Sequence, residues 1–411
     1  MIGNKLSKYP ITIALTLSLF AEGSVYYLMI FSISQQGGTW MLTATSLATL
    51  LPSILVAPAV GWAVDKIPTK TLWVLSLFVS AMTMICMILT SNVSLNVALL
   101  SLQTVCSIMV GSVVFKALPN LHGFTEQTAS AYVVGINSLL AIVTPPLSAL
   151  LFSLGFSGAI WVATALTLIS LAIIAIHIPR ARPDTTRDHT DFKHLRRGLK
   201  SLSGISSLKL YLPAMFAVVL FTTMEDLSGV VYLQDIGRAR LGDIPLDMDP
   251  GLVGYSIILA AWSTGSLLAS VRASKAKRRF DPVTLLILGG ALICVAIIVE
   301  GIVEYLSVIL IFFVMGGIGN AMHNIGVRNT VYEAVPEEIR GRAWSLIGSS
   351  FAAFSIMGKF LGTPHLVGEP KGVITFSGLA GMTVIVASFL WIRRRGWTPH
   401  LWDRPQPPHS S

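Results

Sequence analysis

Long apolar runs alternate with short polar segments along almost the whole chain. A run of about 20 apolar residues can cross the hydrocarbon core of a bilayer as an α-helix. A helix also pairs its own backbone polar groups, which lipid cannot do for it. Twelve such runs lie near residues 10–32, 42–63, 71–90, 96–117, 129–153, 157–179, 210–233, 251–271, 282–303, 305–327, 344–366 and 372–392. The pattern therefore predicts an all-α integral membrane protein with twelve transmembrane helices.

The two halves of the chain repeat each other at an offset of about 210 residues, which indicates a duplicated unit. Ser270 near the end of the eighth run corresponds to Gly61 near the end of the second, and Glu337 after the tenth run matches Glu126 after the fourth. We therefore expect two pseudo-symmetric six-helix bundles. The predicted parts are an N-terminal bundle at 1–179, a basic cytoplasmic linker at 180–209, a C-terminal bundle at 210–395 and a Pro-rich, disordered cytoplasmic tail at 396–411.

The placement of basic residues predicts the orientation of these helices. The chain is 53% hydrophobic and 12% charged, with a formal net charge of +9. If the N-terminus is cytoplasmic, all but four of the 29 Lys and Arg residues lie on the cytoplasmic side, the exceptions being Arg238, Arg240, Lys359 and Lys371. Such a bias is typical of inner loops of membrane proteins. We therefore expect both termini to be cytoplasmic, in a bacterial inner membrane, with the lipid bilayer and no nucleic acid as partner.

The sequence contains no pattern typical of an enzyme or of a bound cofactor. The three cysteines, Cys86, Cys106 and Cys294, lie inside apolar runs, where they are expected to pack as small hydrophobic side chains. Spacings typical of metal ligands, a catalytic triad or a phosphate-binding glycine loop are missing from the sequence. No cofactor, no metal and no direct ATP hydrolysis are therefore predicted.

Two segments carry a family resemblance. The stretch Ala57–Thr71, APAVGWAVDKIPTKT, resembles the loop between helices 2 and 3 of the major facilitator superfamily. Residues 334–362, AVPEEIRGRAWSLIGSSFAAFSIMGKFLG, resemble the helix 10–11 region of the drug:proton antiporters related to macrolide-efflux and enterobactin-export proteins. The resemblance implies two bundles that rock about a central cavity, lined by helices 1, 4, 7 and 10 with parts of 2, 5, 8 and 11.

The same resemblance implies a gate on the cytoplasmic side. In the family, the aspartate corresponding to Asp65 sits beside the start of helix 11 and interacts with basic residues. A carboxylate is favoured at a helix N-terminus by the helix dipole. The predicted gate residues are Gly61, Asp65, Lys66, Lys70, Arg340 and Arg342. The alternative for Asp65 is an ordinary solvated loop charge.

Two features differ from the drug:proton antiporters. The fourth run has no arginine where many antiporters carry one, so an arginine-assisted proton relay is not expected. Pro145 and Pro146 replace the Gly-Pro of the helix 5 antiporter motif; they still bend the helix by removing backbone donors. Antiport and uniport therefore both stay open.

Four ionisable residues within the spans are candidates for proton coupling, because a charge in a bilayer is costly and usually functional. They are Glu22 in the first run, Glu225 and Asp226 in the seventh, and Lys359 in the eleventh. At about 1.5 Å per residue, the acids of the seventh run and Lys359 lie at one level, and Glu22 lies deeper, near the midplane. Only one of the two adjacent acids can face the lysine directly. Glu22 is the first choice for the proton-binding residue and an acid of the seventh run the second.

Structural roles are the alternatives for these groups. Glu22 could be neutralised by hydrogen bonds from a neighbouring helix, and Lys359 with its acid could be a bridge between helices. Polar residues at cavity-facing positions are candidates for substrate contact: Tyr26, Gln103, Asn137, and the three residues Asn320, His323 and Asn324, which share one face of the tenth run. Of these, Tyr26 is one turn from Glu22. His323 lies near the cytoplasmic end and fits an interfacial histidine better than a proton carrier.

These observations predict a monomeric, proton-coupled secondary active exporter of small amphipathic, often cationic compounds. A dedicated exporter of a siderophore or other natural product is an alternative, as is a lysophospholipid transporter. A non-transporting receptor or scaffold is a further alternative from a different class, but the long soluble appendages typical of such proteins are not found. The expected ligands are a small-molecule substrate and protons.

The orientation can be tested by labelling. A cysteine in the loop Gln35–Gly38 is expected to react with a membrane-impermeant thiol reagent in whole cells, and a cysteine at Thr190 is not. The reason is that the basic linker around Thr190 is predicted to be cytoplasmic. The opposite labelling pattern would invert the topology.

Overall fold

The computed structural model describes most of the chain. The described residues are 8–36, 38–56, 59–60, 63, 67–122, 126–178, 206–242, 248–274, 281–334 and 337–396. They are helical almost throughout, and they contain no strand.

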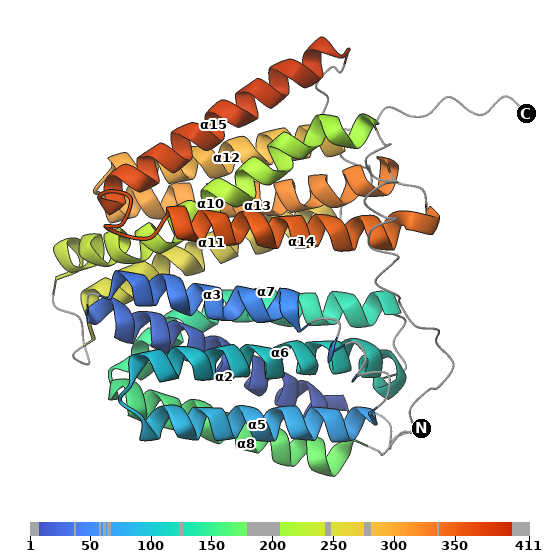
Figure 1. Ribbon diagram of the computed structural model, residues 1–411, viewed down its shortest axis with the longest axis vertical. Helices are drawn as coiled ribbons and strands as arrows, with labels where there is room; N and C mark the ends of the chain where they lie inside the picture. The colour runs from blue at the N-terminus through green and yellow to red at the C-terminus, as the bar shows by residue number, and fades with distance from the viewer. Residues whose placement is uncertain are drawn as a thin grey trace, which may run out of the picture. The chain divides into compact units, whose positions relative to one another are not determined.

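Twelve helices follow one another in the described residues, coloured in chain order in Figure 1. They are α2 (Lys8–Gln35), α3 (Thr39–Leu55), α5 (Thr69–Leu89), α6 (Val93–His122), α7 (Glu126–Phe152), α8 (Gly155–His177), α10 (Ser206–Arg240), α11 (Pro250–Ser274), α12 (Pro282–Ile302), α13 (Leu306–Ala334), α14 (Glu337–Leu361) and α15 (Pro370–Arg394). Each corresponds to one of the predicted apolar runs. The all-α fold class with twelve helices is thereby confirmed.

Ten of these helices are long and apolar enough to cross a membrane, counting only described residues. The two others are α3, with 17 residues, and α14, whose apolar part spans Ser350–Leu361. The predicted span at 42–63 reaches beyond α3, which ends at Leu55, and part of the remainder lies outside the described residues. Helix α10 begins at Ser206, inside the stretch assigned from sequence to the linker 180–209. A helix can continue past its apolar residues because its backbone bonds do not depend on lipid.

The chain divides into two compact units. The first comprises Met1–His189 and Leu233–Ala260, and the second comprises Thr190–Tyr232 and Ala261–Ser411. In the first unit α2 packs mainly on α8 and α7, and α5 packs on α6 and α8. In the second unit α12 packs against α13 and α15. The first unit includes the end of α10 and the start of α11, so the boundaries of the units differ from those of the two sequence halves. The two six-helix bundles expected from the sequence repeat stay a prediction.

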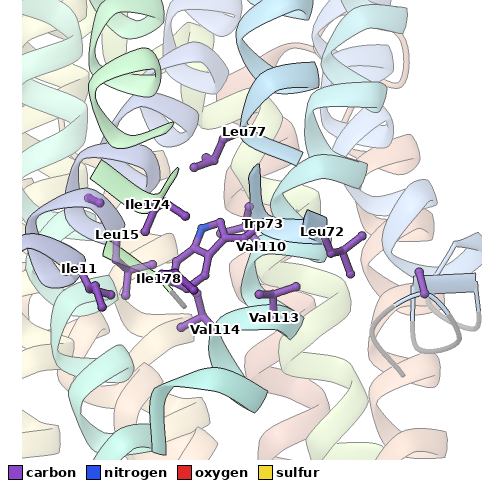
Figure 2. Packing of buried hydrophobic residues seen from close by; sticks show 12 residues of the cluster. Ile11, Leu15, Leu72, Trp73, Leu77, Val110, Val113, Val114, Ile174 and Ile178 are labelled. Carbon is purple, nitrogen blue, oxygen red and sulfur yellow. The ribbon is translucent and has the colours of Figure 1, made fainter. Parts of the chain in front are cut away.

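Trp73 of α5 lies at the centre of an apolar cluster in the first unit. Figure 2 shows its indole ring surrounded by side chains from α2, α6 and α8, among them Leu15, Val110 and Ile174. The side chain is fully buried. A buried aromatic ring contributes a large apolar surface, so this cluster fixes α2 and α6, the helices that also carry the site described below.

Close backbone approach replaces bulky side chains at the contact between α11 and α13 in the second unit. A Cβ atom added at Gly317 would collide with the backbone carbonyl oxygen of Trp262 and lie 3.0 Å from the amide nitrogen of Ser266. The hydroxyl of Ser266 donates a hydrogen bond to the Gly317 carbonyl at 2.8 Å. Small residues that let helices approach closely are typical of membrane interfaces.

We expect Gly317→Ala to destabilise the protein by about 1–3 kcal/mol, because the added methyl group overpacks the contact with α11. Gly372→Ala in α15 is the matched control, since a Cβ there meets no atom within 4 Å. Thermal unfolding in detergent compares the two variants. Equal melting temperatures would show that α11 and α13 do not touch at this glycine.

Candidate functional site

A cavity of about 430 Å³ lies within the first unit. Its walls come from α2, α3, α6 and α7. Four of the residues predicted from sequence line it, namely Glu22, Tyr26, Gln103 and Asn137. Volumes of this order suit a small molecule. The structure therefore brings together predicted site residues from three helices that are distant in sequence.

Among the described residues that line this cavity, Glu22 supplies the only ionisable side chain apart from two tyrosines. One carboxylate oxygen, Oε2, accepts a hydrogen bond from the Ser107 hydroxyl of α6 at 2.7 Å. The other oxygen, Oε1, is buried and has no hydrogen-bond partner in the described structure. Buried polar atoms are paired in most proteins, so an unpaired one calls for a specific explanation.

Two tyrosines of α2 lie next to this carboxylate. Tyr26 and Tyr27 both line the cavity, and their rings meet edge to face with centroids 5.4 Å apart. Aromatic faces attract cations through the ring quadrupole. Gly23, also on α2, allows α7 to approach, because its Cβ position lies 3.2 Å from the Thr144 methyl group. The cavity thus combines one carboxyl group with aromatic surface.

Gln103 lines the cavity, but both atoms of its side-chain amide group are hydrogen-bonded to a neighbouring helix. Its oxygen accepts a hydrogen bond from Thr83 at 2.7 Å, and its nitrogen donates to Ser80 at 2.7 Å. Both partners belong to α5, so the side chain links α5 to α6 and is almost fully buried. Asn137 of α7 is exposed and leaves its amide available to a ligand.

In the second unit, Lys359 of α14 forms an ion pair with Asp226 of α10. The lysine side chain is 8% exposed and the aspartate 40% exposed. Of the two adjacent acids, Asp226 therefore takes the position facing the lysine. Glu225 points elsewhere, toward α12.

The partner of Glu225 is Glu300 of α12, a residue that the sequence analysis missed. Glu300 is completely buried, and its carboxyl group lies within hydrogen-bonding reach of that of Glu225. Its position inside the apolar run 282–303 was the available signal. Because it is only three residues from the end of that run, its depth in the bundle could not be read from the sequence.

The polar residues of α13 separate into two groups. The side-chain amide of Asn324 donates to the backbone and side-chain oxygens of Asn320, at 2.9 and 3.1 Å, and Asn320 reaches Ser266 of α11 at 3.4 Å. His323 is instead buried against α12, with Nδ1 3.1 Å from the Leu286 carbonyl. The predicted single polar face thus comprises the two asparagines, while the histidine is held between helices.

The predicted cytoplasmic gate falls largely outside the described structure. Gly61, Asp65 and Lys66 lie outside the described residues. The backbone of α14 includes Arg340 and Arg342, but the positions of their side chains are not described. The gate accordingly stays a prediction.

A polar cluster at the ends of three helices was not predicted. Asp249, directly before α11, accepts hydrogen bonds from Arg238 of α10 and Gln35 of α2, both at 3.2 Å. Its other oxygen accepts the backbone N–H of Gly251 at 2.7 Å, as in a helix cap. Partial burial opposes ionisation, but these donors outweigh it and lower the pKa of Asp249 below its ordinary value. All of these residues belong to the first unit.

Comparison with known proteins gives a family match and several structural neighbours. A family model described as Major Facilitator Superfamily matches residues 9–359. The fold is similar to a crystal structure of a variant of the nucleoside transporter NupG, with a TM-score of 0.74 at 12% identity over 94% of this chain and 99% of that chain. It is also similar to a POT family transporter in complex with a thioalcohol-conjugated peptide, with a TM-score of 0.73 at 13% identity over 94% and 96% of the two chains. No curated protein sequence matches the chain significantly.

The ion pair of Asp249 gives a pH prediction. Because its pKa is lowered in the folded protein, the stabilisation by the ionised form is present above the ordinary value of 3.8 and is lost as the pH falls through the lower, folded value. We expect Asp249→Asn to reduce stability by up to about 1 kcal/mol at neutral pH. The difference from wild type is expected to persist down to about pH 4 and to shrink below it.

Melting curves in detergent between neutral and acidic pH provide the measurement. Asp235→Asn is the control, because Asp235 contacts the same arginine but is 65% exposed, so its loss is expected to matter less. A difference that already declines near neutral pH would contradict an aspartate held ionised by Arg238.

Proposed function

The chain belongs to the major facilitator superfamily and is a membrane transporter; from this premise we propose that it exports small amphipathic cations in exchange for protons. The cavity around Glu22 supports the proposal most directly. It contains one carboxyl group with a buried, unpaired oxygen, and no lysine, arginine or histidine is among the described residues that line it.

The chemistry of the cavity favours a positively charged ligand. A carboxylate away from water is stabilised by an opposite charge or by a proton. The tyrosines beside it, Tyr26 and Tyr27, offer aromatic surface to an organic cation. A carboxylate and aromatic rings together therefore favour a small organic cation with apolar surface.

Competition at one group can couple the two movements. A proton on Glu22 and a cation beside Glu22 exclude each other, because each neutralises the same negative charge. Each state of the transporter then carries either the proton or the substrate, and the gradient of one drives the other. The hydrogen bond from Ser107 positions the carboxyl group in the cavity.

The anionic alternatives fit this cavity less well. Phosphate on a lysophospholipid or carboxylates on a siderophore would meet the like charge of Glu22, with no basic side chain among the described lining residues to offset it. The nucleoside and peptide transporters that the fold resembles are only 12–13% identical, so their substrates do not transfer to this chain. Location in a bacterial inner membrane, with cytoplasmic termini and a monomeric state, completes the proposal.

The decisive substitution is Glu22→Gln, which keeps the shape and removes the charge. In proteoliposomes with an imposed pH gradient, we expect uphill transport of ethidium to fall by at least about tenfold, because the counter-charge and the proton site are lost together. Addition of ethidium to the purified wild-type protein is expected to release protons, and the glutamine variant to release none.

Glu369→Gln serves as the matched control, because Glu369 is 84% exposed and lies outside the cavity. If the Glu22→Gln variant releases protons as the wild type does, Glu22 is structural. If the wild type transports ethidium without proton release, transport is uncoupled and the exchange mechanism is wrong.

A further inference from the structure

Two carboxyl groups face each other inside the second unit, apart from the Glu22 cavity. Glu225 belongs to α10 and Glu300 to α12. Glu300 has no exposed surface, and neither of its carboxylate oxygens receives a hydrogen bond from a donor group in the described structure. The group within hydrogen-bonding reach is the carboxyl of Glu225.

The packing around the pair leaves room for it by means of a glycine. Gly229 lies one turn beyond Glu225 on α10. A Cβ atom there would collide with Oε1 of Glu225 and lie 3.1 Å from Oε1 of Glu300. The two carboxyl groups therefore occupy the space in front of this glycine, and a side chain at the position would displace them.

The neighbouring charges do not neutralise the pair. Asp226 is a further acid on α10, and Lys359 of α14, the nearest base, forms its ion pair with Asp226. Tyr232, on the same face of α10, has a buried hydroxyl with no partner in the described residues. The charged groups near Tyr232 at the end of the helices are Glu304 and Lys371, which pair with each other at 2.8 Å and are about half exposed.

The balance of charges around Glu225 and Glu300 then determines how many protons the two carboxyl groups hold. With Asp226 and Lys359 compensating each other, ionising both glutamates would leave two uncompensated negative charges side by side and away from water. Two adjacent buried carboxyl groups cannot both ionise without a large cost in free energy. Two carboxylates are also acceptors only, so they bond to each other only if a proton is present.

We propose that Glu225 and Glu300 form a second proton-binding site, which keeps at least one proton between the two carboxyl groups at neutral pH. The site is separate from Glu22, which lies in the first unit. It does not depend on the proposed exchange of cations for protons, and its test does not involve a transported substrate.

Infrared difference spectroscopy of the purified protein tests the site. The spectrum of the wild type minus that of the Glu225→Gln/Glu300→Gln double variant is expected to contain the carbonyl stretch of a protonated carboxyl group, which shifts on deuterium exchange. The corresponding difference for Glu304→Gln, the exposed control acid, is expected to contain ionised carboxylate bands only. The Glu22→Gln variant is expected to retain the band of the pair.

The site is overturned if the double-variant difference contains carboxylate bands alone, because the pair then holds two charges and must bind a cation instead. If the double variant does not fold, the wild type still decides the question. Its protonated-carboxyl signal is expected to persist at neutral pH in the Glu22→Gln background and to change frequency in Gly229→Ala, where the pair is displaced. Absence of any such signal in the Glu22→Gln background refutes the proposal.

Discussion

A carboxyl group removed from water needs a proton, a cation or a hydrogen-bond donor, and this requirement organises the polar interior of the protein. Asp226 satisfies it with the ammonium group of Lys359. The carboxyl group of Glu22 accepts one hydrogen bond, from a serine hydroxyl, and its other oxygen has no partner in the described structure. Glu225 and Glu300 lie next to each other. The buried acids of the fold therefore lie in three different environments, and our two proposals on proton binding rest on the second and the third.

The apolar packing keeps these groups where the requirement applies. In the first unit the cluster around Trp73 joins α2, α5, α6 and α8, and the amide of Gln103 ties α6 to α5 by two hydrogen bonds. In the second unit, Gly317 brings α13 into backbone contact with α11, and Gly229 leaves room for the carboxyl groups of Glu225 and Glu300. A close-packed interior excludes water, and without water the carboxyl groups must find partners within the protein.

The family identifies the chain as a transporter, but it does not identify the substrate. Membership of the major facilitator superfamily means that the chain moves a solute across a membrane, and the structural neighbours share that fold at low identity. The fold is common to transporters of nucleosides and of peptides, so it does not select a substrate. Our proposal of a cationic substrate rests instead on the carboxyl group and the aromatic surface of the Glu22 cavity.

The sequence alone determined the helices, because a span of about 20 apolar residues leaves the backbone no other structure in lipid. It also placed Glu22, two adjacent acids of the seventh run and Lys359 within spans, although it missed Glu300. Counting along helices gives depth, and depth was enough to predict that Lys359 pairs with one of the two adjacent acids, but not which one.

Only the tertiary structure decided which side chains face one another. Helical spacing put Asn320, His323 and Asn324 on one face, yet the histidine packs against α12 while Asn320 contacts α11. Glu300 seemed to lie near a helix end and is fully buried beside Glu225. The physical reason is that periodicity fixes the angle of a residue around its own helix. The rotation, tilt and crossing point of the neighbouring helix set its partner, and these come from packing across the whole unit.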